Sequence, residues 1–111
     1  MRVCFDIDGT ICTIRPDMDY ENAEPIPAMV AAVQAHKRRG DYVILHTARG
    51  DGTGKDWSEV TARQLWDWNV PYDELRFGKP WADLYVDDRA MNAHDYRGNH
   101  AADLIAERFG V

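Results

Sequence analysis

Polar side chains follow several apolar, strand-like stretches of this chain at the point where each stretch ends. They are Asp6 and Asp8 after the first stretch, Thr47 at the end of the second, and Asp87 and Asp88 at the end of a later one. In α/β proteins with parallel strands, ligands bind at the carboxyl ends of the strands. We therefore expect these side chains to converge on one site at the same edge of a sheet.

Four carboxylates gathered at one edge repel one another unless some are protonated or a cation lies among them. Two carboxylates about 4 Å apart repel by on the order of 4 kcal/mol at an effective dielectric constant of about 20. Oxygen ligands without a His or Cys set favour a hard ion, and Mg²⁺ is the natural candidate. A magnesium ion beside the hydroxyl of Thr47 and the ammonium of Lys79 suits a phosphoryl group, whose charge must be neutralised in the transition state. One carboxylate could then act as nucleophile and another as general acid and base.

The elements that must position these residues alternate between strand and helix. Short apolar runs predict strands at 2–7, 41–47, 75–77 and 83–88, and helical spacing predicts helices at 28–39, 56–68 and 99–109. The middle helix is expected to start at Asp56, with Glu59 as its capping-box partner. The proline-rich segment before the first helix is expected to be a loop or small hairpin. Because the strands are apolar on both faces, they predict a parallel sheet covered on both sides in an α/β fold.

The length and composition of the chain narrow the class of protein. The 111 residues suit a single domain, 1–111, and the net charge of −6 argues against a general nucleic-acid surface. A membrane-spanning stretch of about 18 apolar residues and a signal-peptide layout are both absent from the sequence. The two cysteines, Cys4 and Cys12, show no pairing pattern. We therefore expect a cytoplasmic protein that is not inserted in a membrane.

Four sequence motifs resemble, in the same order, those of the haloacid dehalogenase superfamily in its aspartate-based phosphatase branch. They read FDIDGT, ILHTARG, FGKPWAD and LYVDDRA, and the similarity spans residues 3–90. The resemblance implies a Rossmann-like three-layer α/β/α fold with a central parallel sheet. Members of the superfamily often carry a cap domain, but the segments 11–27 and 48–78 are too short to hold one. The chain therefore resembles the small capless phosphatases.

The resemblance also implies a role for each residue that matches a motif. Asp6 is the expected nucleophile, which forms an aspartyl-phosphate, and Asp8 the group that protonates the leaving group and then activates water. Thr47 and Lys79 are expected to hold the phosphoryl oxygens, with Lys79 also orienting Asp6. The expected Mg²⁺ ligands are Asp6, Asp8 through its backbone carbonyl, and Asp87 directly or through water, with Asp88 beside it. The expected substrate-binding residues are Gly9, Thr10, Ala48 and Arg49.

Some residues near the expected site allow two interpretations. Arg49 could bind the non-reacting part of the substrate or pair with nearby acids. Trp57 and Trp81 are expected to be core or subunit contacts, although both flank loops near the site and could stack on a sugar. A Trp-rich exposed helix on a capless enzyme also suggests a homo-oligomer.

The expected substrate is a small phosphorylated metabolite such as a sugar phosphate. Small capless phosphatases with similar motifs are often associated with surface-polysaccharide biosynthesis, and by analogy the resemblance implies a sugar phosphate as substrate. A phosphatase of nucleic-acid 3′ ends is an alternative, since some members of the superfamily share the T-x-R pattern, but the acidic balance would repel a polymer of phosphates. A phospho-acceptor signalling module is a third possibility. It is disfavoured because the phosphorylated Asp of such modules follows an acidic pair, whereas Asp6 comes first here and the pair comes last.

Overall fold

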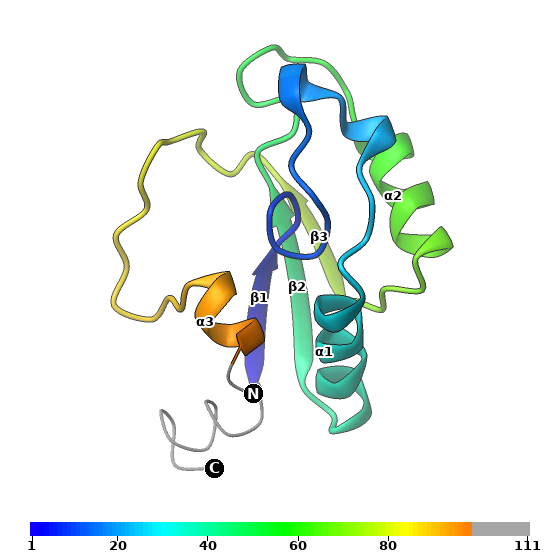
Figure 1. Cartoon of the computed structure of the whole chain (residues 1–111), viewed down its shortest axis with the longest axis vertical. Coiled ribbons are helices and arrows are strands. Elements are labelled where there is room, and N and C mark those ends of the chain that lie inside the picture. Colours follow the sequence, from blue (N-terminus) through cyan, green and yellow to red (C-terminus); the bar gives the residue numbers. More distant parts are fainter. Residues whose placement is uncertain (99–111) are drawn as a thin grey trace. The chain divides into compact units, whose positions relative to one another are not determined.

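The computed structural model of the chain describes residues 1–98 (Figure 1). The chain divides into two units, Met1–Trp81 and the residues from Ala82 onward. The helix expected at 99–109 lies outside the described residues. In the part of the chain that the structure covers, no helix has both the length and the apolar character needed to cross a membrane.

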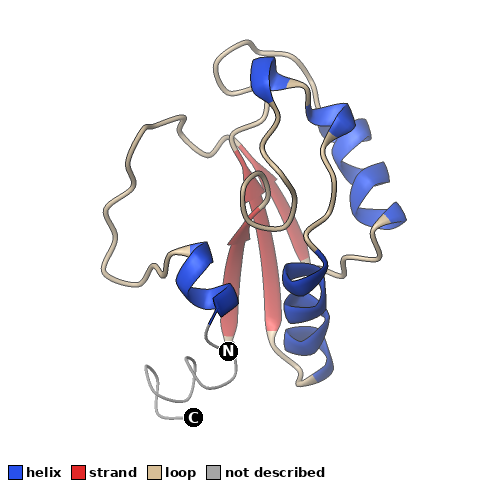
Figure 2. Cartoon of the chain, in the orientation of Figure 1, coloured by secondary structure: helices blue, strands red, loops and turns tan. Residues whose placement is uncertain are grey.

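The first unit contains a three-stranded parallel sheet (Figure 2). Its order is β1-β2-β3, with β1 at Arg2–Asp6, β2 at Tyr42–Thr47 and β3 at Glu74–Phe77. The register places Asp6 opposite His46 and Thr47 opposite Phe77. The prediction of a parallel sheet is confirmed, and the carboxyl ends of all three strands lie at one edge.

Two helices connect the strands, α1 at Pro27–Arg38 between β1 and β2, and α2 at Ser58–Asp67 between β2 and β3. Crossovers between parallel strands are almost always right-handed. Because both crossovers step in the same direction along the sheet, they place both helices on one face, as Figure 1 shows. The sequence predicted a sheet covered on both faces. Helices α1 and α2 cover the same face.

The core of the first unit lies between α1 and the sheet. Helix α1 begins with Pro27, whose fixed φ suits the first helical turn, and ends with a basic last turn. Val33 of α1 and both Val43 and Leu45 of β2 are fully buried. Each such side chain contributes roughly 1.5–3 kcal/mol relative to an exposed position. This packing anchors β2, the strand that carries Thr47 to the sheet edge.

The segment between β1 and α1 is a closed loop with two short 3-10 turns, Pro16–Met18 and Tyr20–Asn22. Backbone hydrogen bonds join its two arms, from Thr13 N to Glu24 O at 2.8 Å and from Ile26 N to Ile11 O at 2.8 Å. The loop or small hairpin expected here is confirmed. It brings Tyr20 back toward α2.

Helix α2 begins two residues later than expected. Its N-cap is Trp57, which makes no side-chain capping bond, so the expected start at Asp56 with a Glu59 capping box is wrong. Asp56 Oδ1 instead accepts hydrogen bonds from the backbone N of Ser58 at 2.9 Å and its Oγ at 2.6 Å. This local turn competes with the capping geometry because short polar side chains bond readily to backbone two residues away.

The strand expected at 83–88 is not formed, which corrects the prediction of a fourth strand. Leu84 and Val86 are 76% and 89% exposed. An apolar run becomes a strand only where a neighbouring strand accepts and donates its ladder hydrogen bonds, and in the described part the sheet consists of β1, β2 and β3. A short helix, α3 at Ala93–Gly98, follows instead, and Asn92 Oδ1 accepts a bond from His94 N at 2.8 Å at its start.

Unfolding should become easier in acid, and a buried carboxylate between α1 and β2 contributes to this. Asp41 is buried, and its Oδ2 lies 2.8 Å from His36 Nδ1 and 2.9 Å from Arg39 Nε. Burial alone raises the pKa of Asp41, but the hydrogen bonds with His36 and with the amino group of Met1, together with the charge of Arg39, outweigh it and hold the pKa below the usual 3.8. A depressed folded-state pKa means that this stabilisation is complete above the unfolded-state value and is lost as the pH falls through the folded-state value.

We therefore expect the free energy of unfolding to fall below about pH 4, measured by urea titration with tryptophan fluorescence. Asp41→Asn should cost about 1–3 kcal/mol at pH 7 and flatten this acid limb. Glu59→Gln, at an exposed position, is the control and should change neither. An acid limb of the same depth in Asp41→Asn would show that another carboxylate produces it.

Candidate active site

Asp6 is the last residue of β1, and its carboxylate lies beside the ammonium of Lys79. Lys79 Nζ donates to Asp6 Oδ1 at 3.1 Å, and the Lys79 backbone N donates to Thr47 O at 3.2 Å. Gly78, at φ 91°, turns the chain directly after β3 and allows this return. Burial raises the pKa of Asp6, and the charge and hydrogen bond of Lys79 offset only part of the rise. The structure thus brings together a carboxylate and a cation that lie 73 residues apart in the sequence.

The residues after β1 form a tight loop that carries Asp8 and Thr10. The carbonyl of Ile7 accepts hydrogen bonds from the backbone N of Thr10, Ile11 and Cys12 at 3.2, 2.9 and 3.2 Å. Gly9 has φ 83°, and a Cβ there would lie 2.7 Å from Ile14 Cδ1. Glycine suits this position because its φ lies in the left-handed region, which residues with a side chain rarely adopt. The loop also places Thr10 Oγ1 3.5 Å from Asp6 Oδ2.

Asp8 is held by a bidentate ion pair with Arg49. Arg49 Nη2 donates to Asp8 Oδ1 at 2.8 Å, and Arg49 Nε donates to Asp8 Oδ2 at 3.0 Å. Thr47 Oγ1, at the end of β2, also reaches Asp8 Oδ2 at 3.4 Å and accepts a bond from Arg49 N at 3.1 Å. Paired N–H donors in a planar fork fix the orientation of a carboxylate more strongly than a single donor does.

The guanidinium of Arg49 is fully buried and is itself held by α2 and by Tyr20. Its Nη1 donates to Thr61 Oγ1 at 2.9 Å and to Gln64 Oε1 at 2.6 Å. Its carbon atom Cζ lies 4.8 Å from the centroid of the Tyr20 ring, and Gln64 Nε2 donates to Tyr20 O at 2.6 Å. The sequence left two roles open for Arg49, binding the substrate or pairing with a nearby acid. These contacts favour the second role, with Asp8 as the acid.

Sequence reasoning missed Thr61 and Gln64. Both are polar and buried, and they lie three residues apart on one face of α2. Buried polar side chains with helical spacing on an otherwise apolar face are a signal that could have revealed a polar partner. The partner, Arg49, lies outside the helix and is not apparent from the spacing.

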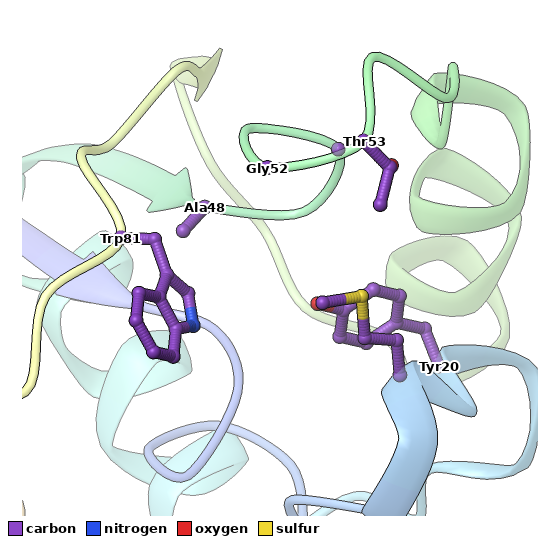
Figure 3. Close-up of a pocket in the computed structure, with 7 residues that line it drawn as sticks. Tyr20, Ala48, Gly52, Thr53 and Trp81 are labelled. Carbon is purple, nitrogen blue, oxygen red and sulfur yellow. The ribbon is translucent and has the colours of Figure 1, made fainter.

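The remaining predicted residues divide between the two units. Ala48 lines a cavity of about 230 Å³ with Met18, Tyr20, Gly52, Thr53 and Trp81 (Figure 3). Asp87 and Asp88 belong to the unit from Ala82 onward, where Asp87 Oδ1 accepts a bond from Arg89 N at 2.7 Å.

Within residues 1–98, no group of three or more His, Cys, Asp and Glu side chains is arranged to hold a metal ion. The four-carboxylate metal cluster therefore stays a prediction, with Asp6 and Asp8 neighbours in the first unit.

The donor chemistry around Asp6 and Asp8 is compatible with a magnesium ion. Asp6 offers carboxylate oxygens, which Mg²⁺ prefers over nitrogen or sulfur. Both side-chain oxygens of Asp8 accept bonds from Arg49, so its backbone carbonyl is the more suitable metal ligand. The arrangement places two carboxylates, Asp6 and Asp8, at one edge of the sheet, each beside a cation of its own.

Comparison with known proteins yields similarity at the level of structure. The chain matches no family model, and no curated protein matches its sequence. The crystal structure of a structural-genomics target from Vibrio cholerae is similar with a TM-score of 0.81 and 24% identity, over 93% of this chain and 92% of that one.

Two structures of the Pnkp1/Rnl/Hen1 complex, one titled an RNA repair complex, are also similar. Their TM-scores are both 0.57, with 20% and 18% identity over 89% and 97% of this chain. The chain spans 34% and 31% of the matched chains, about a third of their length. At these identities the likeness shows a shared fold: the chain is a small α/β domain built on a parallel sheet that other solved structures also contain.

Proposed function

We propose that this chain is a capless phosphatase of the haloacid dehalogenase superfamily, with the Rossmann-like three-layer fold of that superfamily. Its substrate is a small phosphomonoester, and its reaction passes through an aspartyl-phosphate. The observation that carries the proposal is that two carboxylates two residues apart are held by different cations. Asp6 lies beside Lys79, and Asp8 is paired with the buried Arg49. Carboxylates in different environments can take different roles in one reaction.

In the first step, an oxygen of Asp6 attacks phosphorus and the bond from phosphorus to the leaving-group oxygen breaks. Asp8 enters this step as the protonated acid and donates its proton to that oxygen, so the product leaves as an alcohol and Asp8 is left as the carboxylate. Lys79, 3.1 Å from Asp6, balances negative charge at the reacting end of the sheet. The intermediate is a phosphorylated Asp6 side chain.

In the second step, Asp8 accepts a proton from water, and the water oxygen attacks the phosphorus. The bond from phosphorus to Asp6 breaks, inorganic phosphate leaves and the Asp6 carboxylate is restored. Arg49 keeps the Asp8 carboxylate oriented because it holds both of its oxygens. Asp8, which activates the water that hydrolyses the phosphorylated Asp6, is thus held by Arg49 of the ILHTARG motif.

A magnesium ion, when bound, supplies charge neutralisation at the phosphoryl group. The Asp6 carboxylate, the Asp8 backbone carbonyl and one of Asp87 and Asp88 are its proposed ligands. Thr47, Thr10 and the backbone after Gly9 are proposed to contact the phosphoryl oxygens.

Hydrolysis of a generic aryl phosphate should therefore require Mg²⁺. Treatment with EDTA should lower the initial rate about 100-fold or more, since a metal supplies several kcal/mol of transition-state stabilisation. Added Mg²⁺ should restore the rate, as measured by phosphate release. Activity that survives complete chelation would contradict the metal assignment.

A phosphatase of nucleic-acid 3′ ends is a second candidate, supported by the likeness in fold to the Pnkp1/Rnl/Hen1 structures. The net charge of −6 disfavours a long polyanion. A substrate panel that includes a 3′-phosphorylated oligonucleotide, a nucleoside monophosphate and a sugar phosphate separates the candidates by kcat/KM.

A homo-oligomer also stays a proposal. Trp66 of α2, which is 86% exposed, is the apolar residue proposed to contact the second subunit.

A further inference from the structure

A cavity of about 230 Å³ adjoins the loops that carry the proposed catalytic residues. Ala48, which lines it, directly follows Thr47, so the two Cα atoms are about 3.8 Å apart. Trp81, which also lines it, lies two residues after Lys79. Two of the proposed phosphate-site residues, Thr47 and Lys79, are thus followed closely in the chain by residues of this cavity wall.

Aromatic and small residues make up most of the cavity wall. Figure 3 shows the Trp81 indole on one side and Tyr20 on the other, with open space between them and with Ala48 and Gly52 along the upper edge. Gly52 and Ala48 leave room because they carry little or no side chain. The described lining includes no charged side chain, and its polar side-chain groups are the hydroxyls of Tyr20 and Thr53 and the indole N–H of Trp81.

The two aromatic walls are held in place, yet one ring is open to solvent. The Tyr20 ring lies under the Arg49 guanidinium at 4.8 Å and makes an edge contact with Trp57 at 4.9 Å. The backbone N of Trp81 donates to Asp51 Oδ2 at 3.1 Å, while its side chain leaves the residue 67% exposed. A large apolar ring anchored through its backbone and exposed at a cavity is suited to stacking.

We propose that this cavity binds a planar ring of the leaving group, stacked on Trp81, and that the preferred substrates are ring-bearing phosphomonoesters of the nucleoside monophosphate class. This inference rests on the proposed phosphatase function. A sugar carries a hydroxyl on most of its carbons and needs several polar partners, whereas the side chains of this lining offer two hydroxyls and one indole N–H among mostly apolar surface. Pockets for drug-sized ligands are roughly 300–1,000 Å³, so this smaller cavity suits a single ring system.

The test compares Trp81→Ala and Trp81→Phe with the wild type on two substrates, a nucleoside monophosphate and glycerol phosphate. Loss of one stacking partner should raise the KM for the nucleotide relative to that for glycerol phosphate about tenfold in Trp81→Ala. Trp81→Phe, which keeps a ring, should recover most of the preference. Trp66→Ala removes an exposed tryptophan that does not line the cavity and should leave the KM ratio unchanged. An unchanged ratio in Trp81→Ala would overturn the proposal.

A binding measurement separates this proposal from the phosphatase function. Adenosine, which has no phosphate, should perturb the NMR signals of the Trp81 indole and the Ala48 amide in the wild type, and the Ala48 shift should disappear in Trp81→Ala. If the wild type hydrolyses no phosphomonoester in Mg²⁺ but binds adenosine in this way, the ring site stands and the phosphatase function fails. If it hydrolyses aryl phosphates but adenosine perturbs neither signal, the phosphatase function stands and the ring site fails.

Discussion

Replacing Asp6 with asparagine should abolish phosphatase turnover, with kcat lowered at least about 1,000-fold. The amide lacks the charge and nucleophilicity of the carboxylate, and so it cannot form the phosphoryl bond of the proposed intermediate. Its volume is nearly the same, and its oxygen can still accept the bond from Lys79, so the fold should persist. Phosphate release under saturating substrate measures the effect, with far-UV circular dichroism to confirm folding.

Asp17→Asn provides a matched control for the same chemical change. Asp17 is exposed and has φ 57°, a conformation that asparagine also tolerates. Its kcat should stay within about twofold of the wild type. Turnover above about one tenth of wild type in a folded Asp6→Asn protein would mean that the nucleophile is assigned to the wrong residue.

Replacing Arg49 with methionine should lower both activity and stability. The change leaves the Asp8 carboxylate in a mostly buried position without its ion-pair partner, and it removes the bonds to Thr61 and Gln64. Breaking one side of such a pair costs about 3 kcal/mol of unfolding free energy. Because Asp8 loses its fixed orientation, kcat should fall about 100-fold while KM changes little. Steady-state kinetics and urea unfolding measure the two effects.

The double variant Asp8→Asn with Arg49→Met distinguishes loss of orientation from loss of folding. Removing both partners should recover much of the stability that Arg49→Met loses, because no unpaired charge remains. Its kcat should stay low, since the proton-transferring carboxylate is gone. A different result, KM raised and kcat unchanged in Arg49→Met, would show that Arg49 contacts substrate after all.

The sequence alone predicted the parallel sheet and the edge at which Asp6 and Thr47 emerge. Local patterns suffice for this, because short apolar runs, turn glycines and helix ends are read within a few residues of the chain. The same patterns predicted a strand at 83–88 that the structure lacks, since pairing depends on a partner strand elsewhere. Asp87 and Asp88 therefore lack the strand that was expected to carry them.

Sequence patterns by themselves determined the order of the acids, the cation after β3 and the direction of the strands. The tertiary structure decided what each acid touches: Lys79 for Asp6, and Arg49, 41 residues away, for Asp8. It also decided that Gln64 and Thr61 hold Arg49 and that Trp81 lines a cavity with Tyr20. Burial and pairing of charges join residues distant in the chain, and their free energy depends on where the whole fold excludes water, which no local pattern specifies.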